Sequence, residues 1–153
     1  MGKKIYLACS CGKKERTLFE HVAKALREEG FDVYVPFELK IDEKDENGNW
    51  KLSQEEWAEL VFKKDIAAIK LCDIFLMLSD GRIGSAGKNF EHGFAYAIGK
   101  QIIVLQYNNS DISLMTYSGC NSFNNSSYAS LVFDAIKQVM CPTPKGKCET
   151  VLT

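Results

Sequence analysis

Two acidic side chains occupy positions from which they could carry acid–base or covalent chemistry. Glu91 lies about one turn into the helix predicted after a glycine-rich turn, so its carboxylate can face a cleft. A simpler interpretation is a glutamate near the positive end of the helix dipole, which stabilises by about 0.3–1 kcal/mol. Asp65 interrupts the apolar pattern of another predicted helix, although aspartate is a poor helix-interior residue. Its simpler interpretation is a solvated position beside Lys63 and Lys64.

A tyrosine and a serine lie in the same predicted neighbourhood. Tyr6 falls in the first predicted strand, where the simplest interpretation is a core residue with its hydroxyl at the rim. Ser85 precedes a predicted helix, where a serine either caps the helix or, beside glycines, binds phosphate. Neither His21 nor His92 has a partner at metal-ligand spacing. We therefore expect no metal and no cofactor.

Hydrophobic periodicity predicts the elements that position these residues. Apolar runs predict strands over residues 4–9, 31–35, 73–78 and 101–107. Helical spacing predicts helices over residues 17–30, after Ser53, over residues 89–98 and over residues 128–140. Thr17 with Glu20, and Ser53 with Glu56, fit capping boxes at two of these helix starts. No element is predicted in the polar loop after Pro36 or in the Asn- and Ser-rich segment 108–127.

This alternation predicts an α/β fold: a doubly wound, flavodoxin- or Rossmann-like parallel sheet of about five strands, with helices on both faces. Ligands of such sheets bind beyond the carboxyl ends of the strands, near the point where the strand order reverses. The loops after Cys9, Leu78 and Tyr107 should therefore meet there. We expect one domain over residues 1–140 and a tail over residues 141–153.

Composition excludes several classes of function. The 153 residues carry a net charge of −1, too little positive charge for sequence-independent binding of a nucleic acid polymer. No apolar run is long enough to span a bilayer, and the start of the chain does not look like a signal peptide. The 6 cysteines complete no zinc site, and we expect them to be reduced thiols. The expected location is the cytoplasm.

Five separated segments resemble the nucleoside 2-deoxyribosyltransferase family, in the same order along the chain. They are IYLA at residues 5–8, DIAAIKLCDIFLML at residues 65–78, Asp80-Gly, GKNFEHGFAYAIGK at residues 87–100 and SLMTY at residues 113–117. The resemblance implies that Glu91 is a nucleophile that forms a covalent ester with a deoxyribosyl group. It also implies that Asp65 handles the proton of the nucleobase and that Tyr6 positions Glu91. The implied substrate is a small nucleoside or nucleotide, and the implied acceptor is a nucleobase or water.

The resemblance also implies an oligomer with shared active sites, a homodimer or larger. The segment from Ser113 to Met115 would complete the pocket of a neighbouring subunit. Two serines depart from the pattern of the base-exchanging enzymes. Ser85 stands where they usually carry Asp, and Ser113 stands where they usually carry Asn. The sister branch that hydrolyses deoxynucleoside 5′-monophosphates has serine at both positions and uses them on the phosphate.

The run from Glu15 to Glu20 also resembles that hydrolytic branch, although the loop from Ser10 to Lys14 is shorter than its phosphate loop. We predict that the residues binding substrate are Ser85, Gly87, Ser113, Met115, Ser10, Gly12 and Arg16. The predicted activity is cleavage of the N-glycosidic bond of deoxyribonucleosides or their 5′-monophosphates, with a role in nucleotide metabolism or salvage. The alternatives are a strict hydrolase and a non-catalytic nucleotide-binding module. A flavodoxin-like electron carrier is a weaker alternative, because such carriers are usually acidic.

Overall fold

A computed structural model describes residues 2–9, 15–39, 44–80, 85–107, 111 and 113–145. Its centre is a five-stranded sheet in the order β2-β1-β3-β4-β5, and all four strand pairs are parallel. The strands are β1 (Lys4–Ala8), β2 (Asp32–Tyr34), β3 (Ile74–Ser79), β4 (Gln101–Gln106) and β5 (Ser122–Asn125). This order is the doubly wound arrangement in which strand order reverses beside β1. The predicted fold class is confirmed.

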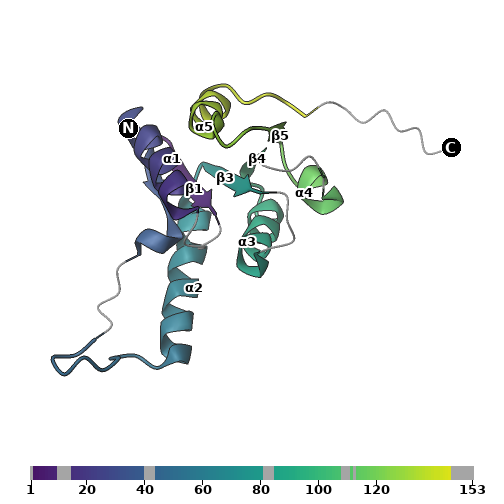
Figure 1. Cartoon of the computed structure of the whole chain (residues 1–153). Coiled ribbons are helices and arrows are strands. Elements are labelled where there is room, and N and C mark those ends of the chain that lie inside the picture. The colour runs from purple at the N-terminus through teal and green to yellow at the C-terminus, as the bar shows by residue number, and fades with distance from the viewer. Residues whose placement is uncertain are drawn as a thin grey trace.

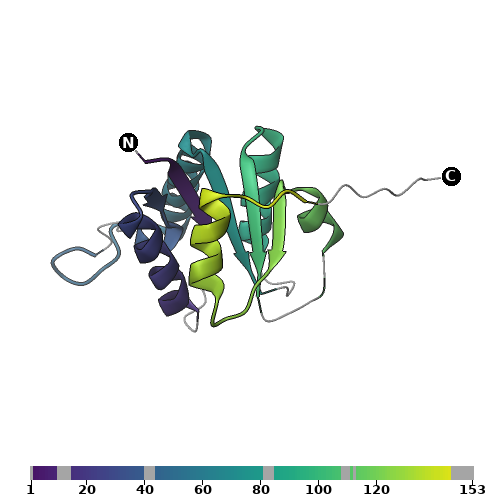
Figure 2. The same cartoon turned by 90° about the horizontal axis from the view of Figure 1, so that it is seen from above.

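Helices cover both faces of the sheet (Figure 1). They are α1 (Arg16–Glu28), α2 (Gln54–Leu71), α3 (Ala86–Ala97), α4 (Leu114–Ser118) and α5 (Leu131–Met140), with a short 3₁₀ helix η1 (Pro36–Glu38) after β2. α1 and α5 lie on one face and α2 and α3 on the other, as the view from above also shows (Figure 2). The first part of α2 extends beyond the sheet (Figure 1).

Alternate residues of a strand belong to two separate hydrophobic cores, because successive side chains of a strand point to opposite faces of the sheet. In β1, Ile5 and Leu7 pack under α1 and α5, whereas Tyr6 and Ala8 pack under α2 and α3. Every residue of β3 is buried, as expected for a central parallel strand. The face under α2 and α3 is the one that carries the candidate residue Tyr6.

Three local predictions are settled by the structure. The capping box at Ser53 and Glu56 is present, with Ser53 Oγ accepting from the Glu56 amide at 3.1 Å. The capping box predicted at Thr17 is wrong, because α1 begins at Arg16 with Glu15 as its N-cap and no side-chain cap bond. The Asn- and Ser-rich segment 108–127 contains α4 and β5, which the sequence pattern did not predict.

The segment after α5 is tied to the domain as far as residue 145. The Thr143 amide donates to Gln138 Oε1 at 2.8 Å, and the Lys145 amide donates to the Asn121 carbonyl at 3.2 Å. The ammonium of Lys145 also donates to the Tyr117 carbonyl at 2.6 Å, at the end of α4. Among the described helices, none is long and apolar enough to cross a membrane.

Candidate active site

An aromatic ladder crosses the sheet on the face that α2 and α3 cover. Parallel pairing places Tyr6 of β1 between Tyr34 of β2 and Phe75 of β3. The ring of Tyr6 stacks on both neighbours, with centroids 5.4 Å apart in each case. His92 of α3 continues the stack beyond Phe75 at 6.3 Å. This ladder fixes the plane of the Tyr6 ring and therefore the position of its hydroxyl.

The Tyr6 hydroxyl is buried and makes no hydrogen bond of ordinary length within the described part of the chain. It nevertheless lies close enough to the Glu91 carboxylate for each group to shift the pKa of the other. Burial, reinforced by the charges of Glu91 and Asp65, raises the pKa of Tyr6 far above its ordinary value. Tyr6 is thus a neutral hydroxyl that faces Glu91 and has a hydrogen left to donate.

Asp65 is buried, with 9% of its surface exposed, in the part of α2 that packs against the sheet. The Tyr34 hydroxyl donates a 2.7 Å hydrogen bond to its Oδ1. Burial raises the pKa of Asp65, and the bond from Tyr34 opposes that rise because it stabilises the ionised form. The solvated interpretation of Asp65, based on its lysine neighbours, is wrong. The side chain turns inward, toward the sheet.

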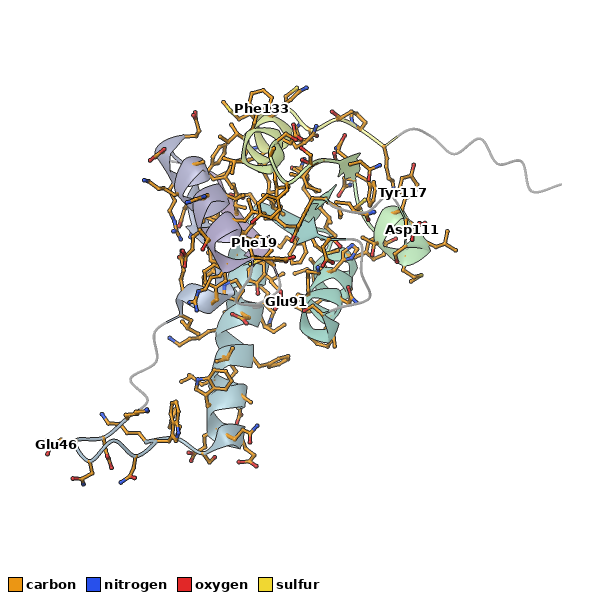
Figure 3. The ribbon with its side chains drawn as sticks, viewed as in Figure 1. Phe19, Glu46, Glu91, Asp111, Tyr117 and Phe133 are labelled. Atoms are coloured by element: carbon orange, nitrogen blue, oxygen red, sulfur yellow. The ribbon has the colours of Figure 1, made fainter. Side chains whose placement is uncertain are left out.

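Glu91 lies in α3, near the centre of the molecule between α2 and the sheet (Figure 3). Burial, reinforced by the charge of Asp65, raises the pKa of Glu91 to about 7, while Tyr6 and Lys88 act in the opposite direction. Each of the two carboxyl groups therefore has a tyrosine: Tyr34 for Asp65 and Tyr6 for Glu91. Because the charge of Asp65 acts on Glu91, the titration of the two carboxyl groups is coupled.

Lys88 brings a positive charge to this acidic site and was not predicted from the sequence. It is the third residue of α3 and only 7% exposed, and its Nζ donates to the Leu78 carbonyl at 3.3 Å. Burial lowers the pKa of Lys88, whereas the charges of Asp80, Cys9, Glu15 and Glu91 raise it. These neighbours come from the ends of β1 and β3 and from the start of α1.

The ends of β1, β3 and β4 meet where the fold predicts a ligand. Tyr107 follows β4, and its hydroxyl donates to Glu15 Oε2 at 2.7 Å. Burial raises the pKa of Tyr107, and the charges of Glu15, Asp80 and Cys9 reinforce the rise. The predicted meeting of the three loops is thus supported at the residues that flank them, while most loop residues lie outside the described ranges.

A cavity of about 490 Å³ opens between α3 and α4. Lys88 and His92 line it from α3, and Ser113 and Met115 line it from the start of α4. His92 is fixed there, since its Nε2 lies 2.8 Å from the Gly119 carbonyl oxygen. Glu91, Asp65 and Tyr6 do not line this cavity.

The two predicted serines are both helix N-caps. Ser85 Oγ accepts from the Lys88 amide at 3.3 Å, and Ser113 Oγ accepts from the Thr116 amide at 3.4 Å. Each bond uses an oxygen lone pair and leaves the hydroxyl hydrogen to donate elsewhere. Gly87 is exposed beside Ser85, and a Cβ at its position would meet no atom within 4 Å, so no steric contact requires glycine there.

Within the described part of the chain, Arg16 contacts Phe37 and Glu20 and neither member of the carboxyl pair. Its Nη2 donates to the Phe37 carbonyl at 3.0 Å, its guanidinium lies 4.7 Å from the centre of the Phe37 ring, and its Nε lies 3.4 Å from Glu20. The two contacts with Phe37 attach α1 to η1. A role for Arg16 in binding substrate stays a prediction. Ser10 and Gly12 fall outside the described residues.

Two residues of the site, Tyr34 and Lys88, escaped the sequence analysis. A signal for Tyr34 existed, because a polar aromatic residue lies in each of the first two predicted strands and neighbouring parallel strands can pair them. Lys88 had no such signal, since a lysine in a first helical turn is ordinarily exposed. Over the described residues, no group of three His, Cys, Asp or Glu side chains could hold a metal ion.

Comparison with known proteins identifies a family. The family model described as nucleoside 2-deoxyribosyltransferase matches residues 5–139. A solved 2-deoxyribosyltransferase from Bacillus psychrosaccharolyticus is 26% identical with a TM-score of 0.67, over 84% of this chain and 90% of that one. A comparison with curated protein sequences gives no significant match.

Two more distant structures share the fold. The CMP N-glycosidase from Clostridium botulinum is 22% identical with a TM-score of 0.60, over 90% of this chain and 99% of that one. A 2-desoxiribosyltransferase from Leishmania mexicana is 17% identical with a TM-score of 0.57, over 92% of this chain and 99% of that one. At these identities the likeness concerns the fold alone.

Proposed function

This chain belongs to the nucleoside 2-deoxyribosyltransferase family, and we propose on that premise that it cleaves the N-glycosidic bond of 2′-deoxyribonucleosides or their 5′-monophosphates. The sugar passes to another nucleobase or to water. The observation that carries the proposal is the carboxyl pair of buried Asp65 and half-buried Glu91, in which each acid lies beside its own tyrosine. A non-catalytic binding module would have no need of two neighbouring acids that are partly or fully removed from water, because such groups are costly to keep together.

In the first half-reaction an oxygen of the Glu91 carboxylate attacks the anomeric carbon of the sugar. The bond from that carbon to the base nitrogen breaks, and its electron pair leaves with the base. Asp65 supplies the proton that the departing base needs. The product is a deoxyribosyl ester of Glu91. The oxocarbenium-like charge on the sugar develops beside a carboxylate, as in retaining glycoside hydrolysis.

In the second half-reaction a nitrogen of the acceptor base, or a water oxygen, attacks the same carbon. The ester bond breaks, its electrons return to Glu91, and Asp65 takes the proton from the acceptor. The Tyr6 hydroxyl supports this cycle as a positioning group, because the aromatic ladder holds it beside Glu91 with a hydrogen free to donate. Burial raises the pKa of Asp65, and a higher pKa favours the protonated form that a general acid needs.

We propose that the active unit is a homodimer or larger, in which the start of α4 enters the site of a neighbour. Leu114 and Met115 support this arrangement because they are 81% and 82% exposed, unusual for apolar side chains in a helix. Further exposed aromatic side chains lie on α2 and α3: Trp57, Phe62, Phe90 and Tyr96. A second copy could cover these apolar surfaces.

We propose Ser85 and Ser113 as ligands of a substrate 5′-phosphate. Both have a hydroxyl hydrogen left after capping, and the amides at the start of α3 favour an anion. Hydrogen bonds to a charged group contribute about 1.5–3 kcal/mol each, so two could favour a nucleotide by about a hundredfold to ten-thousandfold. An aspartate at position 85 would repel the phosphate.

The test measures kcat/KM for a panel of deoxynucleosides and their 5′-monophosphates, with and without a second base. Ser85→Asp should lower the nucleotide-to-nucleoside ratio by at least tenfold while keeping the fold, because aspartate is also a good N-cap. Ser53→Asp makes the same change at the exposed N-cap of α2 and should leave the ratio unchanged. A wild type that prefers the nucleoside and transfers its sugar would overturn the phosphate assignment and leave the transferase activity standing.

The covalent step has its own test. Glu91→Gln should lower turnover by several orders of magnitude without loss of the fold. Mass spectrometry of wild-type protein quenched during turnover should find a deoxyribosyl adduct on the peptide that contains Glu91. A Glu91→Gln rate within tenfold of the wild type would exclude this mechanism.

A further inference from the structure

The short helix α4 buries too little of itself to be held by a hydrophobic core. None of its five residues is buried, and Leu114 and Met115 are 81% and 82% exposed. Helices shorter than about 12 residues are marginal in water unless other contacts hold them. Contacts from outside the helix must therefore fix α4, which forms one wall of the cavity described above.

The segment after α5 supplies such contacts through Lys145. Its Nζ donates to the carbonyls of Tyr117 and Ser118, at 2.6 and 3.2 Å, and lies 5.0 Å from the centre of the Tyr117 ring. Its backbone amide donates to the Asn121 carbonyl at 3.2 Å. The last carbonyls of a helix have no partner within the helix, so an ammonium that binds them fixes its C-terminal end.

The segment that carries Lys145 is itself fixed to the domain. Gln138 of α5 is 5% exposed, and its side-chain amide makes two hydrogen bonds to Thr143. Its Nε2 donates to Thr143 Oγ1 at 3.1 Å, and its Oε1 accepts from the Thr143 amide at 2.8 Å. Pro142 and Pro144 flank Thr143, and their fixed φ reduces the freedom that the segment loses when it is ordered. Lys145 is thus presented to α4 from an ordered backbone.

Other contacts at the end of α4 are uncharged. The Tyr117 ring meets the Phe123 ring of β5 edge-on, with centroids 5.4 Å apart. The Tyr117 carbonyl also accepts from Cys120 Sγ at 3.2 Å, and a thiol is a weak donor. His92 Nε2 lies 2.8 Å from the Gly119 carbonyl oxygen, just beyond the helix. Loss of the Lys145 ammonium should therefore loosen α4 without unfolding the domain.

We propose that Lys145 is a positioning residue that holds α4 where its start can complete a substrate site. The proposal rests on the proposed function, in which the start of α4, from Ser113 to Met115, enters the site of a neighbouring subunit. Lys145 binds the opposite end of α4, so it acts through the helix and not by touching substrate. The two ends are joined directly, because the Tyr117 amide donates to the Ser113 carbonyl at 2.9 Å.

Hydrogen exchange of the free protein tests whether Lys145 holds α4. In Lys145→Met the amides of Tyr117 and Gly119 should exchange at least tenfold faster, while those of α1 keep their rates. Lys145→Arg should keep slow exchange, because a guanidinium can donate to the same two carbonyls. Lys137→Met removes the same charge from an exposed position of α5 and should change nothing in α4.

The amides of α1 also report whether each variant is folded, and Lys145→Gln replaces Lys145→Met if the methionine variant is not. Wild-type exchange of α4 in a folded variant without the charge would overturn the proposal.

Steady-state kinetics test the link to the substrate site. Lys145→Met should raise KM about tenfold with a smaller change in kcat, because Glu91 and Asp65 are intact and only the wall that binds substrate is loosened. Lys145→Arg should restore the wild-type KM. In isolated mixed dimers with Glu91→Gln, the intact Glu91 belongs to the Lys145→Met subunit and the neighbouring α4 keeps its lysine. The KM of these mixed dimers should therefore return to the wild-type value.

A KM that is unchanged in Lys145→Met, or that stays raised in the mixed dimers, would overturn the role of Lys145 at the substrate site. Failure of the proposed function itself would appear as wild-type protein without glycosidic activity. That outcome is distinct, because hydrogen exchange needs no substrate and still decides whether Lys145 holds α4.

Discussion

The phenol of Tyr34 donates a 2.7 Å hydrogen bond to Oδ1 of Asp65, across 31 positions of sequence. The bond joins β2 to α2 on the face where Tyr34 also stacks on Tyr6. It opposes the effect of burial on the pKa of Asp65. Tyr34 therefore decides how readily the proposed general acid keeps its proton, although Tyr34 itself need not touch the substrate.

Tyr34→Phe should raise the pKa of Asp65, because the bond it removes stabilises the ionised carboxylate. The basic limb of kcat/KM should move to higher pH, since Asp65 keeps its proton longer. The stability should fall by about 1–2 kcal/mol from the loss of a partly buried bond to a charged group. Tyr128→Phe, at a half-exposed ring, is the control. A basic limb that stays in place would contradict the assignment of Asp65 as the acid.

Glu91→Gln should stabilise the fold at alkaline pH. In the folded chain Glu91 has a pKa of about 7, raised from 4.5, so the folded state holds its proton more tightly than the unfolded state. Stability therefore falls as pH rises from about 4.5 to about 7 and stays lower above that range. Removing the titration should add about 3 kcal/mol at pH 8 and little at pH 4, since a shift of one pKa unit corresponds to about 1.4 kcal/mol.

Chemical unfolding followed at pH 4, 6 and 8 measures this effect for wild type and Glu91→Gln. Glu55→Gln, at an exposed position in the first turn of α2, gives the matched change without burial. A Glu91→Gln variant less stable than wild type at pH 8 would show that the carboxylate is stabilised by its surroundings rather than strained by them.

Asp65→Asn should slow natural substrates far more than substrates with a good leaving group. General acid catalysis contributes about 10²–10⁴-fold, and only a poor leaving group needs it. The amide of asparagine keeps an oxygen for the Tyr34 hydroxyl, so the local fold should persist. Rates for a natural deoxynucleoside and for a nitrophenyl deoxyriboside make the comparison. Equal losses on both substrates would assign Asp65 a structural role.

Two inactive variants should restore activity to each other if neighbouring subunits share sites. Glu91→Gln removes the nucleophile, and Met115→Asp places a charge on the exposed start of α4 at no folding cost. In a mixed dimer one of the two sites has both an intact Glu91 and an intact neighbour. Equal mixing of closed two-fold dimers should recover about a quarter of wild-type activity.

Native mass spectrometry should confirm that the mixed dimer has formed before its activity is compared with that of each variant alone. If mixed dimers form without any gain in activity, α4 does not complete a neighbour's site. A Met115→Asp variant that is as active as wild type would also show that α4 does not complete a neighbour's site, without any mixing experiment.

Much of the scaffold was determined locally by the sequence. Apolar runs, helical spacing and the capping box at Ser53 predicted the first four strands and their helices, because these signals depend on neighbours within a turn or two. Glu91 became a candidate for the same reason, since the sequence places it about one turn into a helix that follows a glycine-rich turn. The short α4 and β5 escaped prediction because five and four residues carry too little periodicity in a polar segment.

The relationships that give the site its chemistry were decided by the tertiary structure alone. Strand order and register placed Tyr34 beside Tyr6, and the packing of α2 on the sheet turned Asp65 toward them. A lysine in a first helical turn carries no local sign of burial, yet the meeting of β1, β3 and α3 encloses Lys88. Residue types are local properties, whereas the pKa of a carboxyl depends on which distant charges and hydroxyls surround it. The sequence thus named two acids, and only the fold decided which tyrosine and which charges surround each of them.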